Sequence, residues 1–204
     1  MIGVLDYGIG NIGSILNMLK RVGGTAMPVT TAAELAGCDK LILPGVGAFD
    51  QGMALLTESG MRDALDRAVK EGRPLLGICL GMQMLGRRSE EGTSEGLCYI
   101  PFSLKRFRLE NQPELKVPHM GWDFVTLVQP EDKLVRGVEQ PARFYFVHSY
   151  HAVCDDPADT LITCDYGSPI AAAVHRGNVW GAQFHPEKSH RFGMRLLDNF
   201  VKEC

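Results

Sequence analysis

The first half of the chain alternates short apolar runs with amphipathic stretches. Ile2 to Leu5 is a continuous apolar run that predicts a buried strand, and further strands are predicted around Thr25 to Val29 and at Leu41 to Leu43. Between the first two runs, Asn11 is a plausible helix cap and Gly23 a helix stop. The apolar residues between them recur at helical spacing: Ile12, Ile15, Leu16, Leu19 and Val22.

A second helical region follows, from about Phe49 to Val69, with a break near Ser59-Gly60 and a stop at Gly72. The apolar run from Arg73 to Ile78 predicts another buried strand, and residues that favour helices fill Leu80 to Leu85. This repeated strand–helix order predicts the α/β class, with a doubly wound, mostly parallel sheet flanked by helices. In such sheets, sites lie at the carboxyl ends of the strands.

The second half of the chain has a different pattern, in which short predicted strands follow one another with turns between them. A last helix is predicted over Ser189 to Val201, so the extra strands should add an antiparallel part to the sheet. The expected strands are Tyr99 to Leu109, Trp122 to Val128, Arg143 to Val147, His151 to Cys154, Leu161 to Cys164, Ile170 to Val174 and Asn178 to Gln183.

Length and composition predict one globular domain over residues 1–204, since 45% of the residues are hydrophobic and 22% are charged. The net charge of −3 and the lack of a basic patch argue against nucleic-acid binding. No apolar run reaches the ~18 residues of a membrane helix, and the N-terminus does not resemble a signal peptide. The six cysteines form no Cys-x-x-Cys pair, which favours a reducing cytoplasm.

The strongest chemical signal is Cys79, within Gly77-Ile78-Cys79-Leu80-Gly81. A nucleophile flanked by glycines two residues away, at a strand-to-helix junction, is the nucleophile-elbow pattern with Cys in place of Ser. The two glycines should leave room for a sharp turn, and the helix N-terminus should favour a thiolate. The alternative is a buried structural cysteine in a glycine-flanked turn.

A candidate base and its orienting acid lie 106 residues further on (185 − 79), in His185-Pro186-Glu187. In an extended segment, residues i and i+2 point the same way, so the two side chains should face one site. A histidine oriented by a carboxylate completes a nucleophile–base–acid triad. Taken alone, the three residues also fit an ordinary surface loop.

A glycine-rich loop after a predicted strand, Pro44-Gly45-Val46-Gly47, offers backbone donors. Acyl transfer needs N–H groups where the carbonyl oxygen becomes an oxyanion. We expect one donor from Leu80 and a second from the Gly45, Val46 and Gly47 backbone. A plain strand-exit turn is the simpler alternative for the loop alone.

These motifs, in this order, resemble the class I (triad) glutamine amidotransferases. Within that family, the chain is similar to the glutaminase subunits of imidazole glycerol phosphate synthase, which act in histidine biosynthesis. One departure is Asp123, where the family pattern has Asn. The segments that carry the resemblance run from end to end of the chain: Asp6 to Asn11, Pro44 to Phe49, Gly77 to Gln83, His119 to Trp122, Phe146 to Tyr150 and His185 to Ser189.

The resemblance implies that the chain hydrolyses L-glutamine to glutamate and ammonia, without a cofactor or metal. It implies a heterodimer with a (β/α)8-barrel cyclase subunit, which receives the ammonia through a tunnel. It places Gln83, Ser149 and Tyr150 around the bound glutamine, and Trp122 and Lys188 at the partner interface. Pairing with a partner is also expected on physical grounds, because ammonia released at an open site is lost to solvent.

Two other functions stay open at this point. The chain could be the glutaminase of another ammonia-using pathway, or a binding subunit that keeps the fold without turnover. A dinucleotide site is disfavoured: Gly8-Ile9-Gly10-Asn11-Ile12-Gly13 has the glycine spacing, but Pro28 to Thr31 lacks the acid that would hold the ribose.

Overall fold

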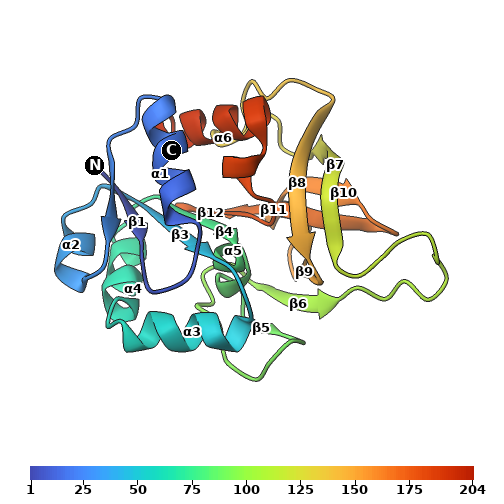
Figure 1. The fold of residues 1–204 in the computed structure, drawn as a ribbon, viewed down its shortest axis with the longest axis horizontal. Helices are drawn as coiled ribbons and strands as arrows, with labels where there is room; N and C mark the ends of the chain where they lie inside the picture. Colours follow the sequence, from blue (N-terminus) through green and yellow to red (C-terminus); the bar gives the residue numbers. More distant parts are fainter.

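A computed structural model describes all 204 residues and joins twelve strands in one sheet (Figure 1). The sheet runs in the order β2-β1-β3-β4-β12-β11-β10-β7-β8, and β5, β6 and β9 branch from this path. Neighbouring strands from β2 to β12 are all parallel, so we call these five strands the parallel half. They are β1 (Ile2–Leu5), β2 (Ala26–Val29), β3 (Lys40–Gly45), β4 (Leu75–Cys79) and β12 (Val179–Ala182).

Helices cover both faces of the parallel half (Figure 1). On one face lie α1 (Ile12–Arg21) and the C-terminal α6 (His190–Lys202). The helices of the opposite face are α2 (Ala32–Ala36), α3 (Phe49–Glu58), α4 (Arg62–Lys70) and α5 (Leu80–Met84). The doubly wound arrangement predicted from the sequence is therefore confirmed for this part of the chain.

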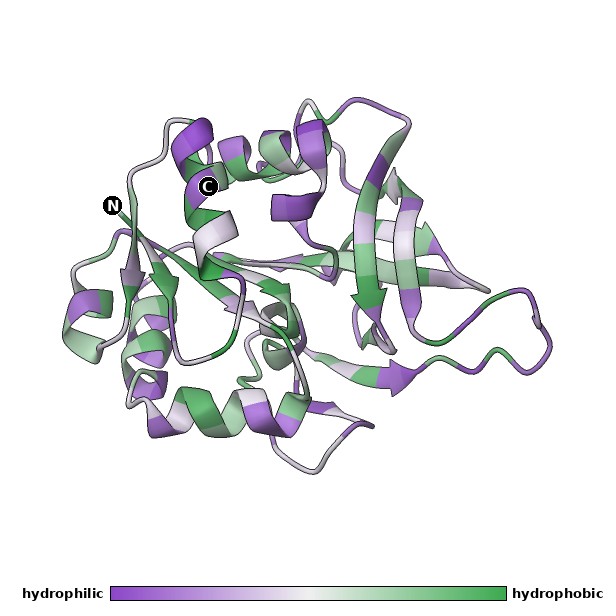
Figure 2. Cartoon of the chain, in the orientation of Figure 1, coloured by the Kyte–Doolittle hydropathy of each residue, from purple (hydrophilic) through white to green (hydrophobic).

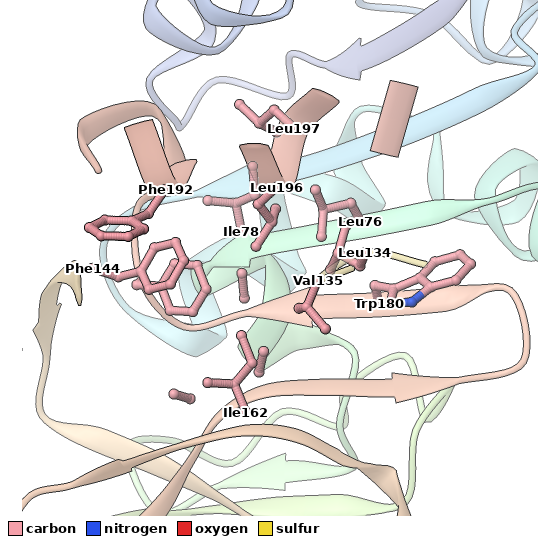
Figure 3. Close-up of a cluster of buried hydrophobic side chains, with 14 of the residues drawn as sticks. Leu76, Ile78, Leu134, Val135, Phe144, Ile162, Trp180, Phe192, Leu196 and Leu197 are labelled. Carbon is pink, nitrogen blue, oxygen red and sulfur yellow. The ribbon is translucent and has the colours of Figure 1, made fainter. Parts of the chain in front are cut away.

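The apolar runs of the central strands alternate between two cores. In β4, Leu75 packs toward α3 and α4, whereas Leu76 packs toward α1 and α6. Figure 3 shows the core on the α1 and α6 face, in which Leu196 and Leu197 of α6 lie close to Leu76 and Ile78 of β4. A strand buried on both faces needs apolar residues at every position, which explains the unbroken runs in the sequence.

The remaining strands form an antiparallel half that extends the sheet beyond β12. Figure 2 shows alternating hydrophobic and hydrophilic positions along its strands, in contrast to the hydrophobic centre of the parallel half. Its strands are β5 (Arg88–Ser89), β6 (Phe102–Arg106), β7 (His119–Leu127), β8 (Ala142–His148), β9 (Tyr150–Cys154), β10 (Thr160–Asp165) and β11 (Pro169–Arg176). Of their contacts, only β5 with β6 is parallel.

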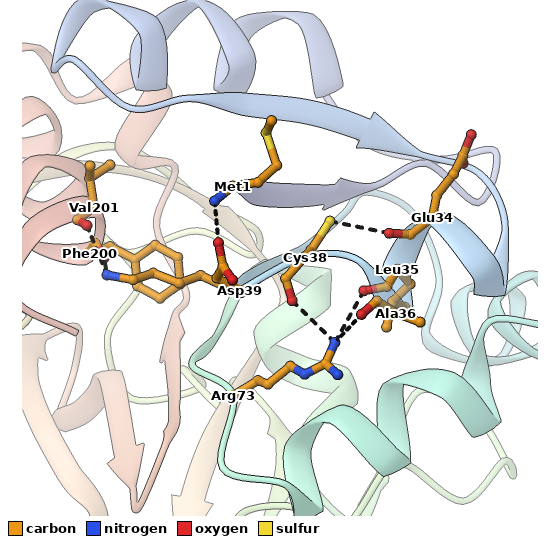
Figure 4. A network of polar contacts seen from close by, with 10 residues as sticks. Met1, Glu34, Leu35, Ala36, Cys38, Asp39, Arg73, Phe200 and Val201 are labelled. Carbon is orange, nitrogen blue, oxygen red and sulfur yellow. Dashed lines mark hydrogen bonds and ion pairs between the residues drawn. The ribbon is translucent and has the colours of Figure 1, made fainter.

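Hydrogen bonds from charged side chains connect strand ends of the parallel half to the C-terminal ends of two helices (Figure 4). The guanidinium of Arg73, just before β4, donates to the carbonyl oxygens of Ala36 (2.8 Å) and Cys38 (3.1 Å) at the end of α2. Lys40 Nζ donates to the carbonyls of Phe200 and Val201 at the end of α6. The side chains of Arg73 and Lys40 thus donate to backbone carbonyls that would otherwise be unpaired at the C-terminal ends of these helices.

Most predicted elements are present, and two local expectations hold only in part. Asn11 is the N-cap residue of α1, as predicted, but its side chain makes no capping hydrogen bond. His185-Pro186-Glu187 is not extended, because Pro186–Lys188 forms a 3₁₀ turn (η2); a second such turn, η1, spans Pro157–Asp159. None of the helices combines the length and apolar character needed to cross a bilayer.

Candidate active site

Cys79 occupies the junction between β4 and α5, at the carboxyl edge of the parallel half. Its backbone angles are φ 54° and ψ −112°, so it lies in the positive-φ region that side chains rarely adopt. Strain of this kind persists only where the surrounding structure enforces it, and it is concentrated at functional sites. The side chain is buried, and its strand position pairs with Gly45 of β3.

The glycines around Cys79 allow that turn, as the sequence predicted. A Cβ on Gly81 would lie 1.8 Å from the carbonyl oxygen of Leu43, and one on Gly77 would lie 2.7 Å from the carbonyl oxygen of Gly81. Both distances are far inside van der Waals contact. The backbone of α5 can therefore pack directly on β3 and β4 only because these side chains are missing.

His185 follows β12, and hydrogen bonds hold both its backbone and its ring. Its N–H donates to the Tyr145 carbonyl (2.9 Å), and its own carbonyl accepts from Ser189 Oγ (2.6 Å). Its ring Nδ1 is 2.9 Å from Glu187 Oε1, and both side chains are almost completely buried. The predicted pairing of His185 with Glu187 is therefore present, although a 3₁₀ turn creates it.

The charges of this site favour a protonated His185. Burial by itself lowers the pKa of His185, but interactions with Cys79 and with the Glu187 carboxylate outweigh burial and raise the pKa to about 9. Nδ1 faces Glu187, whereas the other ring nitrogen, Nε2, is buried without a hydrogen-bond partner. This nitrogen is available for proton transfer inside the site.

A cavity of about 340 Å³ joins these groups. Cys79 and His185 line it together, although Cys79 ends β4 and His185 follows β12. The other lining residues are Val46, Gly47, Leu80, Gln83, Glu91, Pro118, Val147, His148, Ser149 and Tyr150. Cys79 and His185, the predicted nucleophile and base, thus line one small cavity.

The predicted oxyanion residues divide into two groups. Val46, Gly47 and Leu80 line the cavity beside Cys79. Gly45 does not line it: the residue ends β3, and a Cβ there would lie 2.9 Å from Tyr7 Oη. The Tyr7 hydroxyl donates to the carbonyl of Pro44 at 2.6 Å, which anchors the start of this loop.

The three residues expected around glutamine, Gln83, Ser149 and Tyr150, all line the cavity. Gln83 Nε2 donates to the buried Gln183 Oε1 at 3.0 Å, so a second amide orients its side chain. The Ser149 carbonyl accepts from the Phe107 N–H (3.1 Å). This segment closes the cavity from the antiparallel half.

Four lining residues were absent from the predicted site: Glu91, Pro118, Val147 and His148. Glu91 Oε2 accepts from the N–H of Phe49 (2.9 Å), which places the carboxylate at the start of α3. No local sequence pattern marks Glu91, because its position depends on a contact across 42 residues. Burial lowers the pKa of His148 to about 3.

Trp122 and Lys188, the expected interface residues, lie outside the cavity. Trp122 is on the outer face of β7 and stacks on His190, with ring centroids 5.1 Å apart. Lys188 Nζ lies 5.6 Å from the centre of the Tyr145 ring. Met120 and Phe124 share the outer face of β7, with exposed fractions of 63% and 59%. Together, Met120, Trp122 and Phe124 form an exposed apolar strip, the β7 strip.

Comparisons with known proteins agree on a family. A family model described as glutamine amidotransferase class-I matches residues 3–204. The imidazole glycerol phosphate synthase subunit HisH 2 of Pseudomonas aeruginosa is 53% identical over 203 residues, covering 99% of both chains. The HisH subunit of Bdellovibrio bacteriovorus is 49% identical over 204 residues, covering 98% of both chains.

Solved structures support the fold at lower identity. The structure of PurLQS from Thermotoga maritima matches with a TM-score of 0.77 at 18% identity, covering 98% of this chain and 96% of that chain. The CTPS glutaminase domain of Trypanosoma brucei matches with a TM-score of 0.67 at 15% identity, covering 98% and 91%. At these identities the similarity shows a shared fold only.

Proposed function

The chain belongs to the class I glutamine amidotransferases, and we propose that it hydrolyses L-glutamine through a thioester on Cys79. The proposal depends on one observation above all: Cys79, at a positive-φ strand–helix junction, lines the same cavity as His185, whose ring is held by Glu187. A nucleophile, a base and an orienting acid in that order form a complete triad. Glu187 holds His185 so that Nε2 serves the reacting atoms.

In the first half of the reaction, the Cys79 thiolate attacks the carbonyl carbon of the glutamine side-chain amide, and the C=O electrons move to oxygen. His185 Nε2 then gives its proton to the leaving nitrogen. The tetrahedral intermediate collapses, the C–N bond breaks and ammonia leaves, so that a thioester to Cys79 remains. The pKa of about 9 keeps His185 protonated, as this step requires.

In the second half, His185 removes a proton from water, and the resulting hydroxide attacks the thioester. The second intermediate collapses with cleavage of the C–S bond, which returns the thiolate of Cys79 beside a protonated His185. The new carboxyl group loses its proton to solvent, and glutamate leaves. The backbone N–H groups of Leu80 and of the Val46–Gly47 loop would stabilise both oxyanions. Gly45 lies outside the cavity and allows the backbone there to pack closely against Tyr7 and Leu80. Loss of one such donor typically costs about 3 kcal/mol of barrier.

We extend the proposal to a partner, because the relatives are named as subunits of a larger enzyme. The subunits from Pseudomonas aeruginosa and Bdellovibrio bacteriovorus are named as parts of imidazole glycerol phosphate synthase. This chain would pass ammonia to a (β/α)8-barrel cyclase subunit, which makes imidazole glycerol phosphate and aminoimidazole carboxamide ribonucleotide in histidine biosynthesis. The β7 strip and Lys188 offer a docking surface for that subunit.

The proposed setting is the cytoplasm, where the thiol of Cys79 stays reduced. All six cysteines are free, which suits a reducing compartment. No cofactor is needed for the two acyl-transfer steps, since the triad supplies the nucleophile and both proton transfers.

The decisive experiment measures glutamate release from glutamine by the chain alone and with the cyclase subunit plus its nucleotide ligand. We expect the partner to increase release, and we expect Cys79→Ala to lower it by at least about 10³-fold while glutamine still binds. Turnover that survives in Cys79→Ala would overturn the triad. Equal activity with and without the cyclase would leave the glutaminase in place and reject the pathway.

A further inference from the structure

Three potential metal ligands meet on the inner face of the antiparallel half, away from Cys79. His119 and Asp123 project from β7 four residues apart, and Cys164 belongs to the neighbouring strand β10. One donor atom from each side chain lies within 4.8 Å of the others, and His119 Nε2 is 3.3 Å from Asp123 Oδ2. Gly121, between the two β7 residues, has no neighbouring atom within 4 Å of a Cβ built there.

The two β7 side chains are held in fixed orientations. The His119 ring is 3% exposed and is stacked between Phe146 (centroids 4.6 Å apart) and Tyr166 (3.9 Å). Asp123 Oδ1 accepts from the N–H of Phe124 at 2.8 Å, which leaves Oδ2 to face His119. A site whose ligands are already oriented loses little conformational entropy when an ion binds.

Two hydrogen bonds orient the rings of His119 and His148, and two neutral imidazoles supply both N–H groups. His148 Nδ1 lies 2.8 Å from the Tyr150 carbonyl oxygen, and its Nε2 lies 3.1 Å from His119 Nδ1. With both N–H groups used in this way, His119 Nε2 has no proton and lies 3.3 Å from Asp123 Oδ2. Without a further cation, a bare nitrogen lone pair would face the Asp123 carboxylate.

We propose that His119, Asp123 and Cys164 bind a divalent transition-metal ion of the zinc type. Nitrogen, carboxylate and sulfur donors are the set that zinc prefers, and donors around a tetrahedral zinc lie about 3.3–3.6 Å apart at bond lengths of about 2.0–2.3 Å. The 3.3 Å between His119 Nε2 and Asp123 Oδ2 already matches such an edge. Binding releases the Cys164 thiol proton to solvent, and solvent or a small ligand takes the fourth position.

The hydrogen-bond chain provides the outer support that metal-bound histidines usually have. With the ion on Nε2, His119 Nδ1–H donates to His148 Nε2, and His148 Nδ1–H donates to the Tyr150 carbonyl, so every contact has one proton. His148 and Tyr150 also line the proposed glutamine cavity. An ion bound here would stabilise the positions of His148 and Tyr150 in the cavity lining and would cross-link β7 to β10.

The test uses the full chain with Cys79→Ala, since the thiol of Cys79 and the ring of His185 are a competing pair of metal ligands. We expect Zn²⁺ alone, followed by calorimetry, to bind once per chain. Co²⁺ should give thiolate charge-transfer absorption that marks a sulfur ligand. Affinity should fall at least about tenfold in Asp123→Asn and in Cys164→Ala. Cys154→Ala, in β9, is the matched control and should bind like its parent.

Asp123→Asn keeps the shape of the side chain and the acceptor for Phe124, so this variant should fold even if Cys164→Ala does not. Circular dichroism and the Tm of each variant verify folding before the titrations are compared. Two results overturn the proposal: no binding of Zn²⁺ or Co²⁺ to the Cys79→Ala chain, or binding that is undiminished in Asp123→Asn.

Discussion

The two halves of the sheet differ in how many of their faces are buried. The parallel half is covered by helices on both faces, and its strands are apolar at almost every position. In the antiparallel half, β7 buries one face and exposes the other, as the β7 strip shows. The parallel half therefore provides a frame that is packed on both faces, and the antiparallel half provides an exposed face that can bind ligands or partners.

The candidate active site is built where these halves meet. Cys79 comes from the parallel half, whereas His148 and Tyr150 come from the antiparallel half. His185 connects the two, because it follows β12 while its N–H bonds to Tyr145 in β8. Cys79, the proposed nucleophile, thus lies at the edge of the parallel half and faces cavity-lining residues of the antiparallel half.

The largest effect should come from filling the tightest contact of the parallel half. In Gly81→Ala the new Cβ would meet the Leu43 carbonyl oxygen at 1.8 Å, which forces β3 and α5 apart. We expect the free energy of unfolding to fall by more than about 4 kcal/mol, measured by urea denaturation.

Gly177→Ala is the matched control in the β11–β12 turn of the antiparallel half. Gly177 has a φ of +62°, but no atom lies within 4 Å of the new Cβ. Only backbone strain remains, worth about 1–2 kcal/mol. A similar loss in both variants would show that close packing does not distinguish the two halves.

The junction itself should respond to pH through His185. Its pKa is raised from 6.5 to about 9, so it contributes stability below about pH 6.5 and loses that contribution as the pH rises through 9. We expect the wild type to lose up to about 3 kcal/mol between pH 6 and 9.5, relative to His185→Gln. Urea denaturation of both proteins across this range measures the difference, and parallel curves would contradict the prediction.

The exposed face of the antiparallel half should matter for binding and not for folding. Trp122 packs on His190 but is 40% exposed. In Trp122→Ala we expect the affinity for the cyclase subunit to fall by about 2 kcal/mol, roughly 30-fold, with little change in Tm. Val153→Ala removes an exposed apolar residue from β9 and should leave the affinity unchanged. Calorimetric titration distinguishes the two variants.

A smaller effect should follow from loosening the loop on the rigid side of the cavity. Tyr7→Phe removes the 2.6 Å hydrogen bond to the Pro44 carbonyl that anchors the proposed oxyanion loop. We expect about 1 kcal/mol of lost stability and a lower kcat with little change in KM, because the hydroxyl positions the loop without touching substrate. A change in KM alone would assign Tyr7 to substrate binding instead.

The order of strands and helices could be predicted from the sequence because local periodicity determines it. Ile2–Leu5 is a strand over the predicted residues, and the break near Ser59-Gly60 separates α3 from α4. The prediction that His185-Pro186-Glu187 is extended was wrong. A 3₁₀ turn, Pro186–Lys188, brings the side chains of His185 and Glu187 together. The predicted catalytic roles remain predictions that the proposed assays test.

What the sequence determined by itself was the class of fold, the candidate nucleophile and the two glycines that permit its turn, because each depends on neighbouring residues. Tertiary structure alone placed Glu91 at the cavity and brought Cys164 to His119 and Asp123. These contacts join residues more than 40 positions apart. No local pattern encodes such distances, because they follow from strand order and from which face of each strand is buried.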